Sequence, residues 1–505
     1  MLMPSNSERA QFAGNRLRIV IAGAGVSGIL MGIRLRKRGM TNFRIFEKAA
    51  ALGGTWRDNI YPGVACDTPS HAYSYSFAVN TRYTKRYATG PEILKYYGRM
   101  ARKFEIERNI TYNSEVTSAV WTGAAWRIRI NDGEEIEAEV FISACGRLHH
   151  PVIPDLPGLG DFAGPCFHSA RWDQDVELAG KRFGLIGTGS SATQLVTALP
   201  DKVGKLVVFQ RSPHWFITPP NARLGLFHRL KMALIPGAAT RAYWDARAFS
   251  TKMAYERVTP EGRKALAQIC LDALGQIRDP ELRRKLTPDY GVGCKRMVMC
   301  EGYPTGIQKP NVELEVEPIE RIVADGIVMK DGRFHPLDIL CLATGFKSDA
   351  FMRPMTVTGL NGMTLDDLWA ENFINYRTVA LPYMPNFFMI NGPFSPGGTT
   401  TIVFSAEIQS NYVAQLVDRL AEAGGYLVPS EARTRELFAA MQERGKNSIW
   451  STGGCDSWYL DKNGVPIVDP IMPDEMAIIM KHAHFEDFIH EPCLDTELVA
   501  LGRRG

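Results

Sequence analysis

Two glycine-rich segments, each between an apolar run and a helical pattern, restrict the fold of this chain more than any other feature. The first reads Gly23-Ala-Gly25-Val-Ser-Gly28, and the second reads G-T-G-S-S-A over residues 187–192. Each matches the G-x-G-x-x-G/A fingerprint of a strand–turn–helix unit, which holds the pyrophosphate of a dinucleotide at the helix N-terminus. Backbone N–H groups stabilise the phosphate charge there, and a Cβ at Gly25 would obstruct its approach. The chain is therefore predicted to bind two dinucleotides, which indicates a flavin that is reduced by a nicotinamide.

The first fingerprint lies in a complete β–α–β pattern. Residues 18–22 form the continuous apolar run of a buried parallel strand, and a helical stretch over 29–38 and a second strand over 43–47 follow. Glu47 ends that second strand, at the position where an acid accepts hydrogen bonds from a ribose. This first site is predicted to hold FAD.

The second fingerprint has a cation where the first has an acid. Strands over 182–187 and 205–210 are predicted around a helix over 190–199, and Arg211 follows the second strand. A guanidinium there matches the 2′-phosphate of NADP, which a carboxylate would repel. This second site is predicted to hold NADPH. The residues expected to bind it are Gly187, Thr188, Gly189, Ser190, Ser191, Arg211 and Ser212.

Length and composition limit the class of protein. The 505 residues are too many for one ordinary core, and the net charge of +4 includes no basic run that would indicate a nucleic-acid partner. Residues 1–16 have no apolar signal-peptide core. The nine cysteines form no C-x-x-C pair and no metal-like cluster. This pattern favours reduced thiols in a cytoplasmic protein without a metal site.

The predicted fold is α/β, with two Rossmann-type dinucleotide-binding domains and a helical insertion in the NADP domain. Strands at 120–130 and 134–142 are expected to form a hairpin at Asn131-Asp-Gly133, and the Pro- and Gly-rich stretch 149–160 is expected to cross between domains. The predicted segments are the first part of the FAD domain (1–148), the first part of the NADP domain (149–219), the insertion (220–290), the second part of the NADP domain (291–378) and the second part of the FAD domain (379–505).

Residues 224–245 are predicted to form an amphipathic surface helix. Such a helix either packs against another domain or lies on a membrane. Packing is the simpler interpretation, so membrane contact is not expected.

Two further motifs resemble those of one enzyme family. Residues 53–67 match G-G-x-W-x4-Y-P-G-x3-D, and residues 162–173 match F-x-G-x3-H-x3-W-D. Together they resemble the signatures of Baeyer–Villiger monooxygenases. Flavin monooxygenases that oxidise nitrogen or sulfur share the two nucleotide sites but usually lack the tryptophan followed by Asp or Pro. Trp172-Asp173 therefore favours the Baeyer–Villiger family.

The resemblance implies a role for several residues. Arg296 would be the cation that stabilises a flavin C4a-peroxide, Asp67 would orient Arg296, and Lys295 would face the NADP phosphate. Trp458 would close over NADP, and His168 would belong to an interdomain hinge rather than act as a base. The cofactor-binding residues expected outside the second fingerprint are Gly23, Gly25, Gly28, Glu47, Thr55, Trp56, Asp67, Tyr73, Val116, Lys295 and Trp458.

The activity implied is the oxidation of a ketone to an ester or lactone with NADPH and O₂, by a monomer or homodimer. One departure from the family is Pro304 after Tyr303, where paired tyrosines are common, so the substrate side of this loop is expected to differ. Oxygenation at sulfur or nitrogen is the nearest alternative. A disulfide reductase would need a redox-active cysteine pair beside the flavin, and a non-enzymatic nucleotide-binding module would not need the motif at residues 53–67.

Overall fold

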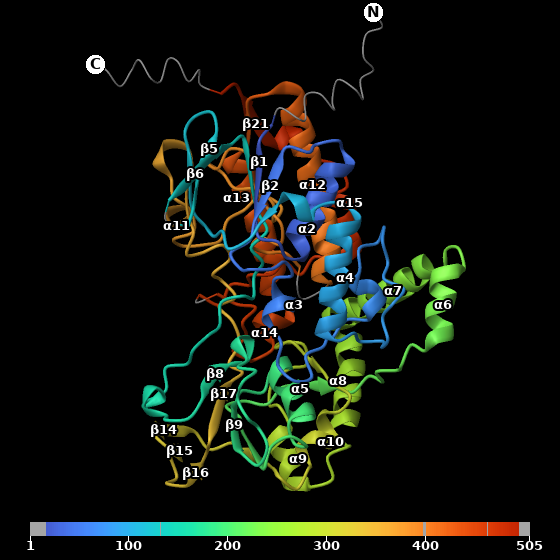
Figure 1. The fold of residues 1–505 in the computed structure, drawn as a ribbon, viewed down its shortest axis with the longest axis vertical. Coiled ribbons are helices and arrows are strands. Elements are labelled where there is room, and N and C mark those ends of the chain that lie inside the picture. The colour runs from blue at the N-terminus through green and yellow to red at the C-terminus, as the bar shows by residue number, and fades with distance from the viewer. Residues whose placement is uncertain (1–16, 132, 397–399, 462, 494–505) are drawn as a thin grey trace, which may run out of the picture.

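The computed structural model describes residues 17–131, 133–396, 400–461 and 463–493. In Figure 1 the N-terminal and C-terminal parts of the chain share the upper half of the molecule, and the middle of the chain forms the lower half. Each half contains one five-stranded parallel sheet. The predicted α/β class is therefore confirmed, while the five-segment division of domains stays a prediction.

The upper parallel sheet contains the first fingerprint. The helix after its glycines, α2 (Val26–Lys37), begins three residues earlier than expected, directly after Gly25, and packs against α12 (Ile402–Ala423). Chain segments far apart in sequence thus build one structural unit around the first fingerprint. In spatial order the strands are β19 (Phe387–Met389), β7 (Val140–Ser143), β1 (Ile19–Ala22), β2 (Phe43–Phe46) and β3 (Ile110–Thr111).

The lower parallel sheet contains the second fingerprint. Its predicted β–α–β unit is confirmed, with α5 (Ser190–Ala198) between two neighbouring strands. In spatial order the strands are β13 (Val312–Glu315), β10 (Lys205–Phe209), β9 (Arg182–Ile186), β17 (Ile339–Leu342) and β8 (Cys166–His168). Ile21 of β1 and Leu185 of β9 belong to one cluster of buried apolar side chains, so the two sheets share a continuous core.

Four helices follow β10 and precede β13 along the chain, in agreement with the predicted helical insertion. They are α6 (Leu226–Leu234), α7 (Ala238–Val258), α8 (Pro260–Leu274) and α9 (Pro280–Leu286). The single helix expected over 224–245 is wrong, because Pro236-Gly237 separates α6 from α7. Proline has no N–H to continue the helical ladder, and Gly237 has a φ of +75°.

The predicted hairpin is confirmed in its pairing but not in its extent. β5 (Trp126–Ile130) pairs antiparallel with β6 (Glu134–Ala138), while Asp132 of the turn lies outside the described residues. The strand expected over 120–130 is interrupted by a turn after β4 (Val116–Trp121), and the one expected over 134–142 ends at Ala138 because β7 belongs to the upper parallel sheet. Alternation marks half-buried strands but does not show to which sheet each belongs.

The remaining elements are short or lie on the outside. The strands are β11 (Phe216–Ile217), β12 (Val298–Met299), β14 (Ile319–Val323), β15 (Gly326–Met329), β16 (Phe334–Pro336), β18 (Thr356–Thr358), β20 (Tyr426–Pro429) and β21 (Phe488–Glu491). The helices are α3 (Thr55–Asp58), α4 (Gly90–Lys103), α10 (Tyr303–Ile307), α11 (Leu365–Leu368), α13 (Glu431–Lys446), α14 (Ile449–Thr452) and α15 (Pro473–Ile479). In the described ranges, none of the helices has the length and apolar character needed to cross a bilayer.

Candidate active site

The N-termini of α2 and α5 have the properties that a pyrophosphate needs. Gly25 and Gly189 precede these helices, and neither helix has a side-chain cap on its first N–H groups. Apart from Gly189 itself and its chain neighbours, none of the described atoms lies within 4 Å of the place where a Cβ of Gly189 would stand. Uncapped amides beside open space at a helix N-terminus favour an anion. The residues present therefore fit the two dinucleotides that the fingerprints predict.

The first glycine of each fingerprint is required for a close approach between strands. Gly23 has a φ of +100°, and a Cβ there would stand 2.7 Å from the carbonyl oxygen of Ala144. Gly187 has a φ of +122°, and a Cβ there would stand 2.3 Å from the carbonyl oxygen of Ala343. Any side chain would push the turn away from the neighbouring strand end.

The Glu47 carboxylate lies at the first glycine turn, as the sequence predicts. It is 4% exposed and accepts hydrogen bonds from the backbone N–H of Ala24 at 2.9 Å and of Ala49 at 3.0 Å. Arg57 of α3 donates a third at 2.9 Å, a partner that sequence reasoning missed. Val116 lies nearby, because Ser114 binds the carbonyl oxygen of Glu47 through its N–H at 2.9 Å. The oriented carboxylate beside the turn is consistent with a ribose partner.

The aromatic residues of the first motif form a buried pair. Trp56 Nε1 donates to Tyr73 Oη at 3.3 Å, and the two rings meet edge to face with centroids 5.5 Å apart. Burial raises the pKa of Tyr73 well above its ordinary value, so its hydroxyl stays protonated. Thr55 opens α3 directly before Trp56 and is exposed. Contact of these residues with the flavin stays a prediction.

Arg296 and Asp67 are brought together although 229 residues separate them. Arg296 Nη2 and Nε donate to Asp67 Oδ2 at 2.5 and 3.1 Å. The side chain of Asp67 is 16% exposed, while that of Arg296 is 40% exposed. The carboxylate raises the pKa of Arg296, and this outweighs the opposing effect of burial. The Arg296 guanidinium therefore keeps its positive charge and is held by Asp67, while part of its side chain remains accessible.

A second arginine in this region, Arg257 on α7, was not predicted. Burial lowers the pKa of Arg257, and the charges of Tyr459, Arg296 and Asp67 act on it with smaller effects. The Arg257 side chain also lies against Gly293 in the loop before Arg296. No motif distinguishes Arg257 from the other cations of this helix. The helical insertion thus contributes charge to the candidate site.

The residues predicted for the NADP phosphate also converge. Lys295 Nζ donates to Ser212 Oγ at 3.0 Å, and Thr188 Oγ1 donates to the carbonyl oxygen of Ser212 at 2.8 Å. Burial, followed by the charge of Arg211, lowers the pKa of Lys295. Burial and the charges of Lys295 and Arg211 lower the pKa of His214 to about 4. Two cations around hydroxyl donors form a site suited to a phosphate.

A disulfide joins Cys294 to Cys455, so the expectation of nine reduced thiols is wrong. The other seven cysteines are free. The bond ties the loop before Arg296 to the loop that carries Trp458, and Gly291 also donates its N–H to the carbonyl oxygen of Gly453 at 2.9 Å. The two cysteines are 161 residues apart, so only tertiary packing reveals that they pair.

Trp458 packs on Tyr459, with ring centroids 4.1 Å apart, and lies 5.4 Å from the guanidinium of Arg147. Burial lowers the pKa of Arg147 to about 10. Arg147 also donates to the carbonyl oxygen of Ser348 at 3.1 Å, which places Trp458 beside the crossover near residue 149. Closure of Trp458 over NADP stays a prediction.

The Y-P-G part of the first motif contacts the second nucleotide unit. Tyr61 Oη donates to Gln194 Oε1 on α5 at 2.8 Å, and Gln194 Nε2 donates to the carbonyl oxygen of Ala65 at 3.0 Å. A Cβ on Gly63 would stand 2.9 Å from the carbonyl oxygen of Gln194. Sequence reasoning missed Gln194, whose only signal is its place on the fingerprint helix. These contacts connect the two nucleotide units directly.

The motif at residues 162–173 supports the lower sheet. Trp172 stacks on Phe183 of β9, with ring centroids 6.0 Å apart. His168 ends β8, is 3% exposed, and accepts the N–H of Ala170 at Nδ1. Its ring lies 5.6 Å from that of Phe346. These contacts favour a structural role for His168 over that of a base.

The burial of His168 leads to a prediction about stability. Burial lowers the pKa of His168 to about 4, whereas an exposed histidine titrates near 6.5. Between these values the unfolded chain binds the proton and the folded chain does not, so the free energy of unfolding falls as the pH decreases through this window. Denaturant unfolding is expected to show that His168→Gln removes up to about 3 kcal/mol of this loss. The exposed His482 is the control: if His482→Gln flattens the profile equally, the prediction is wrong.

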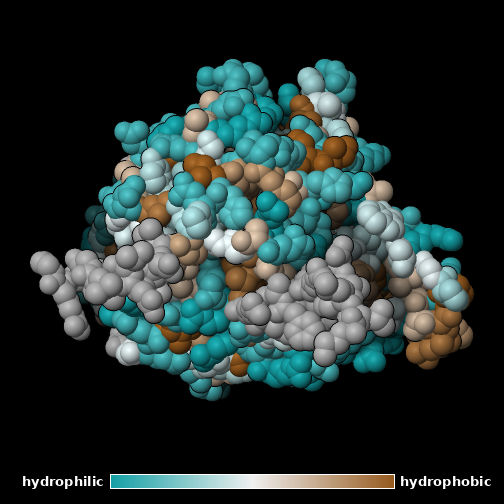
Figure 2. Space-filling view, turned by 90° about the horizontal axis from the view of Figure 1, so that it is seen from above, coloured by the Kyte–Doolittle hydropathy of each residue, from teal (hydrophilic) through white to brown (hydrophobic). Residues whose placement is uncertain are grey.

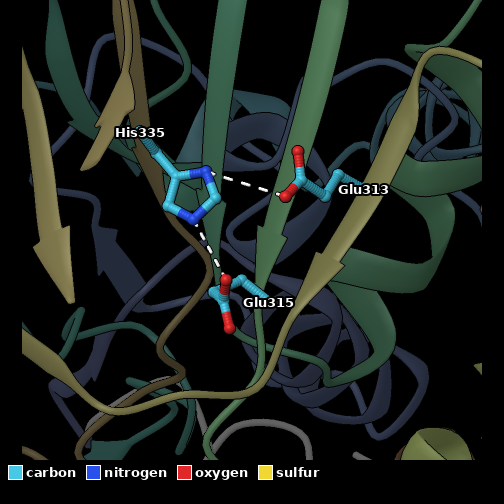
Figure 3. A group of neighbouring side chains, drawn as sticks. All are labelled: Glu313, Glu315 and His335. Atoms are coloured by element: carbon cyan, nitrogen blue, oxygen red, sulfur yellow. Dashed lines mark hydrogen bonds and ion pairs between the residues drawn. The ribbon is translucent and has the colours of Figure 1, made fainter. Parts of the chain in front are cut away.

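One cluster outside these sites has metal-like spacing. In Figure 3, Glu313, Glu315 and His335 point toward one another, with ligand atoms within 4.8 Å. Arg333, however, donates to both oxygens of Glu315, and the next two backbone N–H groups of the chain donate to it as well. A bound guanidinium already supplies the positive charge that a metal would bring. We interpret the cluster as an ion-pair network between β13 and β16.

Comparisons with known proteins agree with this geometry. A family model described as pyridine nucleotide-disulphide oxidoreductase matches residues 20–227; the three cysteines of this stretch, Cys66, Cys145 and Cys166, are free thiols. The chain is 40% identical over 473 residues to an uncharacterized monooxygenase of Mycobacterium tuberculosis, a match that covers 93% of this chain and 95% of the relative.

Two further comparisons are more specific. A Baeyer–Villiger monooxygenase of Streptomyces coelicolor is 36% identical, with 89% of this chain and 87% of the relative covered. The solved structure of an oxidized steroid monooxygenase bound to NADP has a TM-score of 0.84 and 28% identity, covering 94% of this chain and 99% of that one. A further relative, 32% identical with 92% of this chain covered, is a FAD-binding monooxygenase of Aspergillus niger. The chain belongs to the Baeyer–Villiger monooxygenase family of FAD-dependent enzymes.

Proposed function

We propose that this protein oxidises a ketone to an ester or lactone, with Arg296 as the catalytic cation. The observation that supports this most directly is the ion pair between Arg296 and Asp67, which joins the second part of the chain to the first motif. Bound FAD, reduced by NADPH, supplies the electrons that activate O₂. The protein must then stabilise negative charge next to the substrate carbonyl.

Arg296 is suited to that task for an electrostatic reason. Its guanidinium remains charged because Asp67 raises its pKa, and the two-point contact restricts its orientation. A donor that is already oriented stabilises the developing oxyanion without reorganisation at the moment of reaction. Asp67 is a positioning residue here, since it binds Arg296.

The cations at Arg211 and Lys295 have a separate task. They are proposed to bind the 2′-phosphate of NADPH, with Ser212 and Thr188 completing the site. Gln194 and Tyr61 connect this site to the first motif. Binding of the nicotinamide nucleotide at α5 would therefore affect the position of the loop that carries Asp67.

A panel of ketones and sulfides, incubated with the enzyme, NADPH and ¹⁸O₂, tests the proposed reaction. We expect at least one ketone to give an ester or lactone that carries one labelled oxygen atom, as mass spectrometry would show. Sulfoxide as the sole labelled product would instead indicate a sulfur-oxygenating enzyme. Unlabelled ester would show that O₂ is not the source of the inserted atom.

A further inference from the structure

We propose that α6 docks the enzyme on the surface of an anionic phospholipid bilayer. The helix and its C-cap expose large apolar side chains: Leu226 is 60% exposed, Phe227 88%, Leu230 43%, Leu234 73% and Ile235 53%. The expectation that residues 224–245 pack against another part of the protein therefore holds for Met232 and Tyr243, which are buried, but not for this exposed side of α6. Docking would be additional to the proposed oxidation and does not depend on it.

The spacing of these side chains makes one continuous stripe. At about 100° of rotation per residue, Leu226, Phe227, Leu230 and Leu234 fall within about 100° of one another on the helix. In Figure 1, α6 lies at the right-hand extreme of the molecule, away from both parallel sheets. Figure 2 shows hydrophobic atoms gathered at the same edge. The stripe thus projects where a flat surface can reach it.

The opposite side of α6 is fixed to the protein. Met232 is 8% exposed, and the ring of His228 lies 5.6 Å from that of His71 in the 3₁₀ helix η1 (Ser70–Tyr73), which also carries Tyr73. These two positions lie about 150° to 170° from the centre of the stripe. The helix therefore keeps its apolar side outward in the folded protein.

The positive charge around α6 favours an anionic partner. Arg229 and Lys231 lie on the two borders of the apolar stripe, about 90° to 110° from its centre, and Arg223 and Arg241 are exposed just outside the helix. The chain has no Asp or Glu between Asp201 and Asp245. Within the described ranges, none of the ion pairs involves these four cations. An apolar stripe bordered by cations fits acyl chains below anionic headgroups, whereas a second copy of this basic face would repel it.

Vesicle sedimentation of the full-length holoenzyme tests the proposal. Vesicles of equal parts phosphatidylglycerol and phosphatidylcholine are expected to bind the enzyme at low salt. Vesicles of phosphatidylcholine alone are expected to bind it with an affinity at least about fivefold lower, because each cation near an anionic surface contributes about that factor. Equal binding to both, or to neither, would overturn the proposal.

Variants separate the two contributions. Phe227→Ser is expected to weaken binding at least about tenfold, while Ile478→Ser, which removes a 76% exposed residue of α15, leaves it unchanged. Lys231→Glu is expected to weaken binding at least about fivefold, while the exposed Lys330→Glu has no effect. FAD content and NADPH oxidation should be normal in all four variants, which shows that they fold.

The same variants test whether the apolar stripe binds another protein molecule instead of a membrane. Sedimentation velocity without lipid is expected to give the same oligomeric state for the wild type and Phe227→Ser. If Phe227→Ser instead dissociates an oligomer and leaves vesicle binding intact, the stripe is a protein interface and the proposal is wrong.

Discussion

An Arg296→Ala enzyme is expected to form ester about a hundred to a thousand times more slowly than the wild type, because removal of one oriented donor to an oxyanion costs about 3–4 kcal/mol. FAD reduction should keep its normal rate, since Arg211 and Lys295, which are proposed to bind the NADPH phosphate, are unchanged. Stopped-flow measurement of flavin bleaching and chromatography of the ester separate the two half-reactions. NADPH oxidation without ester formation is the expected signature.

Two further variants keep this result interpretable. Removing Arg296 leaves the carboxylate of Asp67, which is 16% exposed, without its partner, and an unpaired buried charge destabilises the fold. Arg296→Lys retains the charge but not the two-point contact, so an intermediate loss is expected. The exposed Arg241→Ala serves as a matched control and should behave as wild type. Ester formation by Arg296→Ala at the normal rate would contradict the assignment.

Replacement of Arg211 or Lys295 by alanine is expected to raise the KM for NADPH by about ten- to a hundredfold, since a charged hydrogen bond to the phosphate contributes about 1.5–3 kcal/mol. The KM for NADH should change little, because NADH has no 2′-phosphate. Steady-state NAD(P)H oxidation with each nucleotide measures this ratio directly. The selectivity for NADPH should therefore fall in both variants.

Lys202, exposed near the other end of α5, offers the control. Lys202→Ala removes the same kind of charge from the same unit, away from Arg211, so its nucleotide preference should equal that of the wild type. If Arg211→Ala raises the KM for both nucleotides equally, Arg211 supports the fold of the site and does not bind the 2′-phosphate.

The local features of the nucleotide units were predictable because they depend on short stretches of chain. Gly23 and Gly187 are required by backbone conformation and close strand contact, and Glu47 lies where the length of a β–α–β unit places it. The helical stretch at 220–290 was predictable from its pattern as well. Its break at Pro236-Gly237 was not expected, although both residues are visible in the sequence.

Contacts across long separations were not predictable in the same way. Arg257 and Gln194 are ordinary helix residues by sequence, and they join the candidate site only because α7 and α5 pack against loops from other parts of the chain. The pairing of Cys294 with Cys455 is of the same kind. The resemblance to a family led to Arg296 and Asp67, while the structure supplied their distance.

Sequence alone established two dinucleotide units, an acid in one and a cation in the other, because a phosphate imposes short-range demands on glycines, helix N-termini and charges. The fold was needed to show which distant groups meet, as in the Arg296–Asp67 pair and the Lys295–Ser212 contact, and that one face of α6 points outward. Burial and pairing of these groups depend on packing between segments separated by many residues, and no periodicity in a single stretch records that packing.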